Sequence, residues 1–420
     1  MTGQGSGWSV PVQTITSPGG IRAWLIEDRS VPVVSLSFAF KGGSALDPAG
    51  KEGRATLAAA LLDQGAGELD TAAFSTALRD RAVSISFGAG RDEFTGSARM
   101  LAEETGFAAE MLALAMTKPR FDGSAIARVK AGRAIALRRE AEDPRSIASR
   151  AWWERSLSPH PFARPPGGTE AALAVLARDD LTVAIADQLR RGSLIAAASG
   201  AIDGPGLGRL LDAAFGAVPA GDAAAVAPMP EPARFGVALV ERDAPQAVAI
   251  FGHGGPSPDD PDWEACQVVN WILGGGGFSS RLTEEIREKR GLTYGIGTQI
   301  APFAGRSLVL GSVSTENPRF GETLSLLKAE WARMAETGPT AEEVENAKAF
   351  LTGSFPLGFT STGQIAGTLV ALQSLGRRPE WLGNRIARVQ AVTLADAQRA
   401  ARRLLDPAAL SVSVVGRPAI

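Results

Sequence analysis

The strongest constraint on the fold of this chain is that its two halves repeat the same pattern of segments. A stretch rich in Ala and Pro, residues 217–236, separates two parts of similar length. Each part opens with a strand-like apolar run, at 33–43 and at 247–255. Each part closes with an amphipathic helix, a short turn and an apolar strand that ends at glycine, at 179–200 and at 391–416. This repetition indicates an internal duplication, and the Ala/Pro-rich stretch is typical of a linker.

Within each half, helical and strand-like patterns do not alternate strictly. Long helical patterns at 124–142 and 341–352 follow stretches rich in strand signals, which favours an α+β fold over a parallel α/β sheet. Thr340 and Glu343 have the spacing of a capping box at the start of the second of these helices. The expected fold class is therefore α+β, with a mainly antiparallel sheet in each half and helices packed on one face of it.

These patterns predict two homologous domains, 1–216 and 237–420, joined by the linker at 217–236 into one clam-like chain. The hydrophobic content of 45% and charged content of 21% are ordinary for a globular protein that buries large cores. The chain of 420 residues is long enough for two such domains.

Charge and hydropathy exclude several classes of partner. The 43 basic and 45 acidic residues nearly cancel and form no basic block, so no nucleic-acid surface is indicated. No apolar run approaches the eighteen or so residues of a membrane span. The start, MTGQGSGWSVPV, lacks the basic and apolar parts of a signal peptide. We expect a soluble protein of the cytoplasm, or of the periplasm if a signal was removed.

Histidine and cysteine are scarce, which limits the possible catalytic sites. The chain has two histidines, His160 and His253, and one cysteine, Cys266, so an internal disulfide is impossible. Catalytic zinc usually needs three protein ligands, and neither histidine has a second ligand at helical spacing. The shortage also argues against a Ser-His or Cys-His hydrolase, although one histidine would suffice in principle. His253 follows the apolar run AVAIFG and is interpreted as a histidine at a strand end.

Three segments carry a resemblance to a known family. They are GGSALDPAGKEGRATLAAALLDQG, EDPRSIASRAWWERSLSPHPFARPPGGTEAALAVL and LGGGGFSSRLTEEIREKRGLTYGIGTQI. With these segments the chain resembles, over essentially its whole length, the insulinase-like zinc peptidases of family M16, in the group similar to processing peptidases. The third segment is the most specific, because it combines a glycine run, Ser-Arg-Leu and an Arg–Tyr pair seven residues apart.

The resemblance implies that the zinc site is lost. Active members of the family carry His-x-x-Glu-His on a helix, where two histidines bind zinc and the glutamate acts as general base. The matching histidine positions hold Thr56 and Ala60, and Ala59 stands at the position of the base. The third ligand position falls near Leu137. The chain is thus similar to the non-catalytic subunit that lacks this motif, with no cofactor of its own and zinc expected in a partner subunit.

The second half keeps two residues able to do chemistry, Arg287 and Tyr294. RLTEEIREKRG predicts a helix with Leu282 and Ile286 on one face and Gly291 as its αL cap. LTYGIGTQI predicts a strand whose alternation puts five residues on one side: Leu292, Tyr294, Ile296, Thr298 and Ile300. The turn from helix to strand can bring Arg287 and Tyr294 into one cleft.

In the family that this chain resembles, a matching Arg and Tyr approach the zinc site from the opposite domain or subunit. The resemblance assigns Arg287 to gripping a substrate carbonyl and Tyr294 to stabilising the oxyanion, acting on the partner's zinc site. A tyrosine hydroxyl is a suitable preorganised donor, and arginine offers several planar donors. The alternative is that Arg287 pairs with Glu284 on the surface and Tyr294 packs in a sheet.

The glycine run, Gly274, Gly275, Gly276 and Gly277, follows an amphipathic helix that Gly274 is expected to end. It neither follows a strand nor matches G-x-G-x-x-G, so a phosphate site is not indicated. The non-catalytic subunit of mitochondrial processing peptidase has a similar glycine-rich loop that touches substrate. The resemblance makes the four glycines and Phe278 a substrate-binding segment. A plain flexible turn is the alternative.

Together these observations predict a zinc-less subunit of a heterodimeric M16-type metallopeptidase. Its partner would be a homologous zinc-binding M16 subunit, and its substrate an unfolded peptide. The alternative is a structural subunit with no role in proteolysis, like the core subunits of respiratory complexes that share this fold. A third hypothesis, an independent hydrolase with another nucleophile, is disfavoured by the scarcity of histidine. The sequence does not name the partner or the substrate, and it does not choose between a heterodimer and a homodimer.

Overall fold

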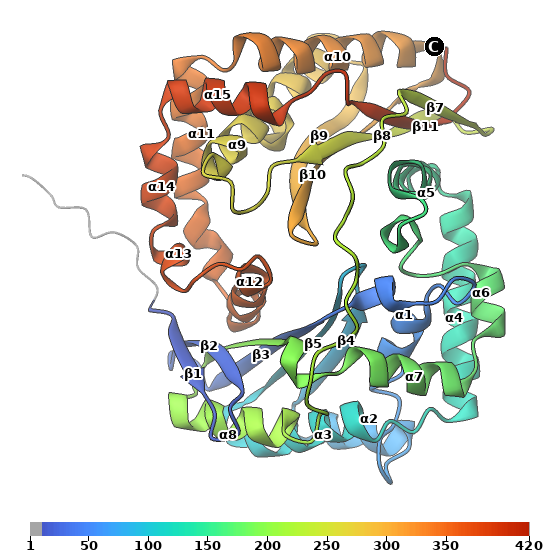
Figure 1. The fold of residues 1–420 in the computed structure, drawn as a ribbon, viewed down its shortest axis with the longest axis vertical. Helices are drawn as coiled ribbons and strands as arrows, with labels where there is room; N and C mark the ends of the chain where they lie inside the picture. The colour runs from blue at the N-terminus through green and yellow to red at the C-terminus, as the bar shows by residue number, and fades with distance from the viewer. Residues whose placement is uncertain (1–10, 420) are drawn as a thin grey trace, which may run out of the picture. The chain divides into compact units, whose positions relative to one another are not determined.

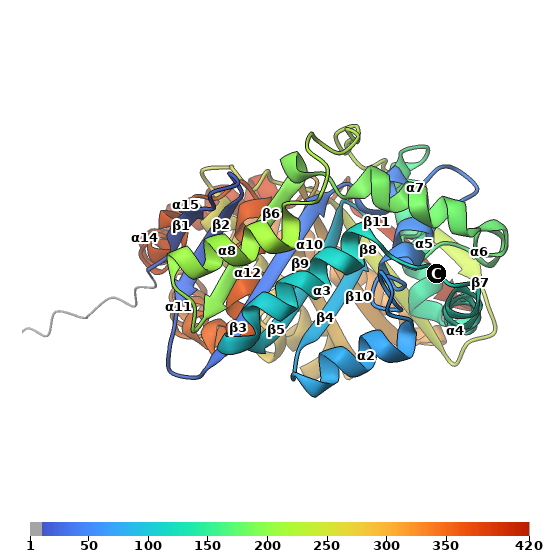
Figure 2. The same ribbon diagram turned by 90° about the horizontal axis from the view of Figure 1, so that it is seen from below.

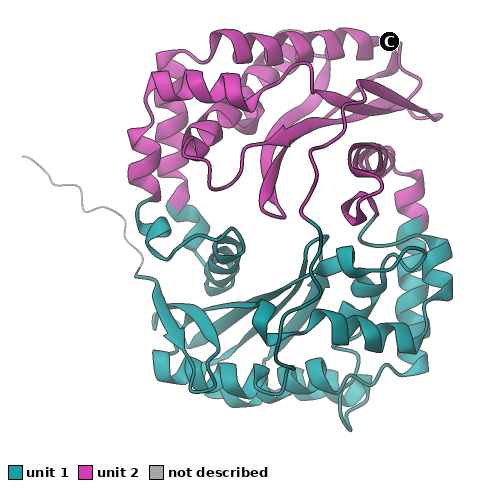
Figure 3. Cartoon of the chain, viewed as in Figure 1, with its two compact units in different colours: residues 1–137, 165–227, 356–384 teal, residues 138–164, 228–355, 385–420 magenta. Residues whose placement is uncertain are grey.

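The computed structural model describes residues 11–419, which form two compact units, each around one β-sheet (Figure 1). Unit 1 comprises Met1–Leu137, Pro165–Ala227 and Pro356–Asn384, and unit 2 comprises Arg138–Arg164, Pro228–Phe355 and Arg385–Ile420 (Figure 3). Each unit therefore includes one segment from the opposite half of the sequence. Residues 217–236, all described, form no helix or strand, and β7 begins at Val237.

The sheet of unit 1 has six strands. Their order is β1 (Gln13–Thr16), β2 (Arg22–Glu27), β6 (Leu194–Gly200), β3 (Val33–Lys41), β5 (Glu93–Leu101) and β4 (Ser84–Ala89). Strands β2 and β6 are parallel, and every other neighbouring pair is antiparallel.

The sheet of unit 2 repeats this arrangement with five strands. Their order is β7 (Val237–Glu241), β11 (Ser411–Gly416), β8 (Gln246–Gly255), β10 (Arg306–Glu316) and β9 (Thr293–Phe303). Strands β7 and β11 are parallel and the other pairs are antiparallel, as in the series β2, β6, β3, β5, β4 of unit 1. The predicted α+β class and the internal duplication are confirmed by this shared topology.

The helices of unit 1 cover both faces of its sheet. They are α1 (Arg54–Ala59), α2 (Thr71–Asp80), α3 (Thr105–Thr117), most of α4 (Gly123–Glu142), α6 (Glu170–Val175), α7 (Arg178–Gln188), α8 (Gly204–Phe215), α12 (Thr362–Ser374) and α13 (Glu380–Gly383). Helices α2, α3 and α8 lie along one face of the sheet (Figure 2). Leu36 and Phe38 of β3 are fully buried in the apolar core on that side.

Helix α12, from the second half of the sequence, packs on strands β3 and β6. The hydroxyls of Ser35 and Thr362 are 2.8 Å apart, and Gln373 Nε2 donates to the oxygen of Ala196 at 3.0 Å. Successive residues of a strand face opposite sides of the sheet. The side chains of Ser35 and Leu36 therefore pack against helices on opposite faces. The small polar residues of β3 thus mark the face that α12 covers.

Unit 2 is built in the same way. Its helices are α5 (Pro144–Leu157), α9 (Trp263–Asn270), α10 (Phe320–Thr337), α11 (Ala341–Gly353), α14 (Arg385–Ala391) and α15 (Leu394–Leu404). Helix α5, from the first half of the sequence, packs on β8 and β11, and Trp152 Nε1 donates to the oxygen of Ser411 at 3.1 Å. Val412 and Val414 of β11 belong to the core formed with the other helices. None of the helices between residues 11 and 419 is long and apolar enough to cross a membrane.

Candidate functional site

The glycine run of unit 2 lies inside a helical segment. Helix α9 passes directly into a π-helical turn, Trp271–Gly275, in which the amide of Gly276 donates to the oxygen of Trp271 at 2.8 Å. The expectation that Gly274 ends the helix was therefore wrong, because the chain widens to π-helical hydrogen bonding instead of stopping. Short π-helical turns of this kind are frequent at functional sites.

Close contacts explain three of the four glycines of this run, and a left-handed backbone angle explains the fourth. A Cβ atom on Gly274 would lie 2.9 Å from the main-chain nitrogen of Thr298, and one on Gly275 would lie 3.2 Å from the oxygen of Asn270. Gly277 has a φ of 58°, in the left-handed region that favours glycine. Gly274 therefore rests directly on β9, whereas Gly275 and Gly276 lie close to Asn270 and Trp271 of the preceding helical segment.

Phe278 and Arg287 form the second part of the site. The ring of Phe278 is 72% exposed, and Cζ of Arg287 lies 4.4 Å from its centroid. Arg287 lies in a second π-helical turn, Thr283–Glu288. A guanidinium at this distance from an aromatic ring makes a cation–π contact, so the structure brings the predicted arginine onto the predicted substrate-binding segment.

The alternative pairing of Arg287 with Glu284 does not occur. Glu284 pairs with Lys289 at 3.0 Å, while Nε of Arg287 lies 3.5 Å from its neighbour Glu288. In the described part of the chain, no hydrogen bond engages the guanidinium of Arg287. Among the described residues, the guanidinium of Arg287 therefore contacts the ring of Phe278 and the carboxylate of Glu288.

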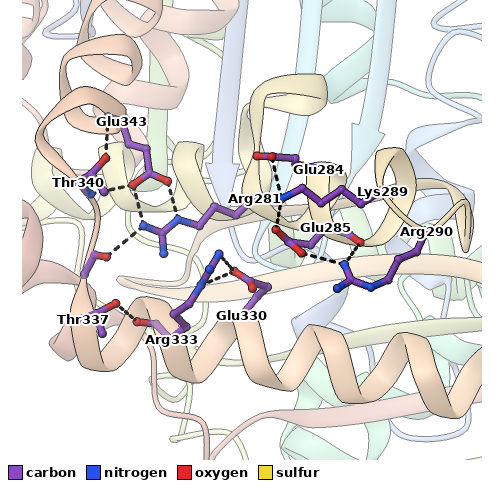
Figure 4. A network of polar contacts seen from close by, with 11 residues as sticks. Arg281, Glu284, Glu285, Lys289, Arg290, Glu330, Arg333, Thr337, Thr340 and Glu343 are labelled. Carbon is purple, nitrogen blue, oxygen red and sulfur yellow. Dashed lines mark hydrogen bonds and ion pairs between the residues drawn. The ribbon is translucent and has the colours of Figure 1, made fainter.

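The segment that carries Arg287 is anchored by an ion pair that the sequence analysis did not single out (Figure 4). Arg281 donates from Nε and Nη2 to the two carboxylate oxygens of Glu343, at 2.6 and 2.7 Å. Glu343 also accepts from the amide of Thr340 at 2.7 Å, which confirms the predicted capping box of α11. Burial raises the pKa of Glu343, but the hydrogen bonds from Arg281 and Thr340 outweigh it, so the pKa is below its usual value.

A second set of ion pairs fixes the end of the same segment. Glu285 accepts from Lys289 at 2.6 Å and from Arg290 at 2.8 Å (Figure 4). These hydrogen bonds hold the pKa of Glu285 below its ordinary value. Ile286 is fully buried, as the helical pattern predicted, and Gly291 has the expected left-handed φ, at 60°.

Tyr294 is the only tyrosine of the chain, and its side chain is 89% exposed. The register between β9 and β10 shifts at a β-bulge. Thr293 pairs with Thr315 and Ile296 pairs with Val313, so a stretch of β9 that is one residue longer lies opposite the same part of β10. A β-bulge of this kind re-aims a side chain. The expectation that Tyr294 lies on the same side of the strand as Ile296 was therefore wrong, and so was the alternative of Tyr294 packed in the sheet.

Thr293, which the sequence analysis overlooked, holds this bulge. Its hydroxyl donates to the oxygen of Ser314 at 2.5 Å and accepts from the amide of Gly295 at 3.0 Å. In the described structure no hydrogen bond, ion pair or ring contact joins Tyr294 to Arg287. The two residues belong to the same short segment, with Arg287 turned onto Phe278 and Tyr294 turned to solvent.

In unit 1, the positions of the family's zinc ligands do not fit a metal. Thr56 donates its hydroxyl to the oxygen of Pro166 at 2.7 Å. Ala59 and Leu137 belong to the apolar core, and Ala60, just after the end of α1, is exposed. These side chains offer zinc one neutral hydroxyl that is already hydrogen-bonded. Between residues 11 and 419, no group of three or more His, Cys, Asp or Glu side chains is placed to hold a metal ion.

The contacts of the two histidines and the cysteine indicate structural roles for these residues. His253 lies near the end of β8, as expected; its Nδ1 is 2.6 Å from the oxygen of Gly254, and its ring meets Trp331 edge to face. His253 and Cys266 both line a cavity of about 250 Å³. Burial raises the pKa of the Cys266 thiol to about 12, so it is not a nucleophile at neutral pH. Nδ1 of His160 accepts from the amide of Phe162 at 3.2 Å.

Comparison with known proteins gives consistent matches. The family model for the peptidase M16 inactive domain matches residues 176–351. The non-peptidase homolog YmxG of Helicobacter pylori is 26% identical over 79% of this chain and 77% of its own length. An uncharacterized zinc protease of Streptomyces coelicolor is 32% identical over 43% of this chain and 39% of its own length.

Solved structures agree with these relatives. A crystal structure of a peptidase M16 inactive domain from Pseudomonas fluorescens has a TM-score of 0.91 and 26% identity, and the alignment covers 98% of each chain. A complex III structure from Candida albicans has a TM-score of 0.79 at 15% identity, which shows a shared fold. These comparisons show that residues 176–351 match the peptidase M16 inactive domain and that the chain as a whole is similar to non-catalytic proteins of the M16 peptidase family.

Proposed function

We propose that this chain is the non-catalytic subunit of a two-chain M16 peptidase. The zinc ion and the general base belong to a homologous partner that carries His-x-x-Glu-His. This chain supplies Arg287, Tyr294 and the glycine run to the peptide that the partner cleaves.

The exposure of Tyr294 carries this proposal. The one tyrosine of the chain is 89% exposed on the strand next to the Arg287 segment, and a β-bulge turns it there. Packing gives no reason for this arrangement, because a regular strand would place the ring in the core. A phenolic hydroxyl free of protein partners is a suitable donor for the oxyanion of a tetrahedral intermediate.

Arg287 supports the same role. Its guanidinium lies against the ring of Phe278 and, within the described structure, makes an ion pair with Glu288 but no hydrogen bond. Such a group can hold a peptide carbonyl with two N–H donors. Among the relatives, a probable mitochondrial-processing peptidase subunit beta of Schizosaccharomyces pombe is 27% identical over 61% of this chain. Its name describes one subunit of a larger peptidase, which is the arrangement proposed here.

The test is reconstitution with the zinc-binding M16 chain of the same organism. Cleavage of an unstructured fluorogenic peptide is measured for each chain alone and for the equimolar mixture. The expected result is activity that only the mixture shows. If the zinc-binding chain is equally active with and without this one, the structural alternative is favoured. If this chain cleaves peptides by itself, the proposal is wrong.

A further inference from the structure

Among the buried polar atoms of unit 2 that have no hydrogen-bond partner within the described residues, three lie together beside the glycine run. They are Oδ1 of Asn270, Nε1 of Trp271 and Oγ1 of Thr298. The three residues are only 7%, 9% and 8% exposed. Buried polar groups are nearly always hydrogen-bonded, so three such atoms in neighbouring side chains call for an explanation.

All three side chains lie against the glycine run. A Cβ atom on Gly274 would be 2.6 Å from Oγ1 of Thr298, and one on Gly275 would be 2.7 Å from Nδ2 of Asn270. A Cβ atom on Gly276 would be 2.8 Å from the indole ring of Trp271. Gly275 itself is exposed. At Gly275, the backbone of the run therefore lies between the side chain of Asn270 and solvent.

These polar groups lower the stability of the folded chain. An unsatisfied buried donor or acceptor is destabilising, whereas an apolar group of the same shape at that place is neutral or stabilising. Valine would fit the position of Thr298 in β9 equally well by shape. Features that reduce stability are concentrated at functional sites, so the three side chains are best explained by a ligand that bonds to them.

The chemistry of the three atoms identifies the class of ligand. Asn270 Oδ1 accepts, Trp271 Nε1–H donates, and the hydroxyl of Thr298 does either. The set is uncharged and needs a ligand that alternates N–H and C=O groups, which is the main chain of a polypeptide. One exposed aromatic ring flanks it, since the ring of Phe350 lies 5.3 Å from that of Trp271.

We propose that Asn270, Trp271 and Thr298 form a binding site for the main chain of an extended, uncharged peptide. The glycine run covers this site in the free chain and moves aside when the peptide enters. Four successive glycines make such a movement easy, since glycine adopts a wide range of backbone angles. This inference rests on the proposed function and adds the contacts that recognise the substrate independently of its side chains.

Thr298→Val tests the proposal on the full chain without any partner. The probe is a fluorescein-labelled, unstructured peptide of Ala, Ser and Gly, and its dissociation constant is measured by fluorescence polarisation. We expect the variant to bind the peptide about fivefold to tenfold more weakly, as for one lost hydrogen bond. We also expect it to melt about 2 °C higher, because the unpartnered hydroxyl is gone. Unchanged affinity, or a lower melting temperature, would overturn the proposal.

Ser413→Ala is the matched control. The hydroxyl of Ser413 is also buried and unpartnered within the described residues, but it lies on β11, which is separated from β9 by two strands, β8 and β10. This variant is expected to keep the affinity of the wild type.

A second probe has N-methylated backbone amides, so it keeps its side chains and loses its main-chain donors. We expect this probe to bind more weakly than the unmodified peptide; equal binding of the two probes would contradict main-chain recognition. These binding measurements need neither zinc nor a partner chain. The proposed peptide site can therefore be supported even if the reconstituted pair shows no peptidase activity.

Discussion

The hydroxyl of Thr293 donates to the main-chain oxygen of Ser314, 2.5 Å away, across the bulge that turns Tyr294 to solvent. The same hydroxyl accepts from the amide of Gly295. One side chain thus satisfies main-chain groups that the slipped pairing would leave without partners. We therefore expect the exposure of Tyr294 to depend on this hydroxyl.

Thr293→Val is expected to loosen the bulge, because valine has the same shape but no hydroxyl. The free energy of unfolding should fall by about 1–2 kcal/mol. Since Tyr294 is the only tyrosine, 3-fluorotyrosine gives one ¹⁹F NMR signal that reports its surroundings. We expect that signal to shift or broaden in Thr293→Val and to return to its wild-type position in Thr293→Ser. An identical spectrum for all three proteins would show that Thr293 does not position Tyr294.

Local patterns in the sequence predicted much of this region correctly. The capping box of Thr340 with Glu343 and the αL conformation of Gly291 depend on neighbours in the chain, and both were predicted. The bulge at Tyr294 was missed because it arises from pairing with β10, about twenty residues further on. A pattern of alternating residues carries no information about a slip in the partner strand.

The sequence patterns also did not predict that α5 and α12 each belong to the unit formed mainly by the other half of the chain. Both segments have ordinary helical patterns, and their place is set by long-range contacts such as Trp152 with Ser411 and Gln373 with Ala196. The serines of β3 and β11 could have indicated that a second helical layer covers these strands, because they interrupt sequences that are otherwise apolar. Similarly, the chemistry of Arg287 and Tyr294 was inferred from a resemblance, whereas Arg281 was missed because its partner lies 62 residues away.

Arg281→Ala should destabilise the chain by about 2–3 kcal/mol, since it leaves Glu343 partly buried without its partner and loosens the start of α11. Arg234→Ala is the matched control, because the pair of Arg234 with Asp406 is exposed on both sides; a loss below about 1 kcal/mol is expected. Urea denaturation followed by circular dichroism measures both. Equal losses in the two variants would contradict an anchoring role for Arg281.

The stability of unit 2 should depend on pH through His253. Burial holds the pKa of His253 below its ordinary value, so the folded protein favours the neutral ring. The unfolded chain takes up the proton at about pH 6.5, and stability therefore falls as the pH drops below that value. We expect the urea midpoint to decrease between pH 7.5 and pH 5.5, and His253→Gln to show a smaller decrease. A wild-type urea midpoint that is constant over this pH range would contradict the dependence of stability on His253.

The residues at the former zinc positions predict that the folded chain does not need metal. Dialysis against a chelator should leave its melting temperature unchanged, because Thr56, Ala59, Ala60 and Leu137 bind no ion. Metal analysis of the purified chain should find far less than one zinc per molecule. Stoichiometric zinc, or a melting temperature that falls on chelation and recovers with added zinc, would be incompatible with this expectation.

The most direct test of the proposed function is the turnover number of the reconstituted pair with Tyr294→Phe. The exchange removes one hydroxyl from a side chain that is 89% exposed, so folding and pairing should be retained. Arg402→Ala, at another exposed position of unit 2, is the control and is expected to behave as the wild type. If Tyr294 stabilises the oxyanion, kcat should fall by about 10²–10³ with little change in peptide affinity. A pair that contains Tyr294→Phe and cleaves peptide as fast as the wild-type pair would contradict the account.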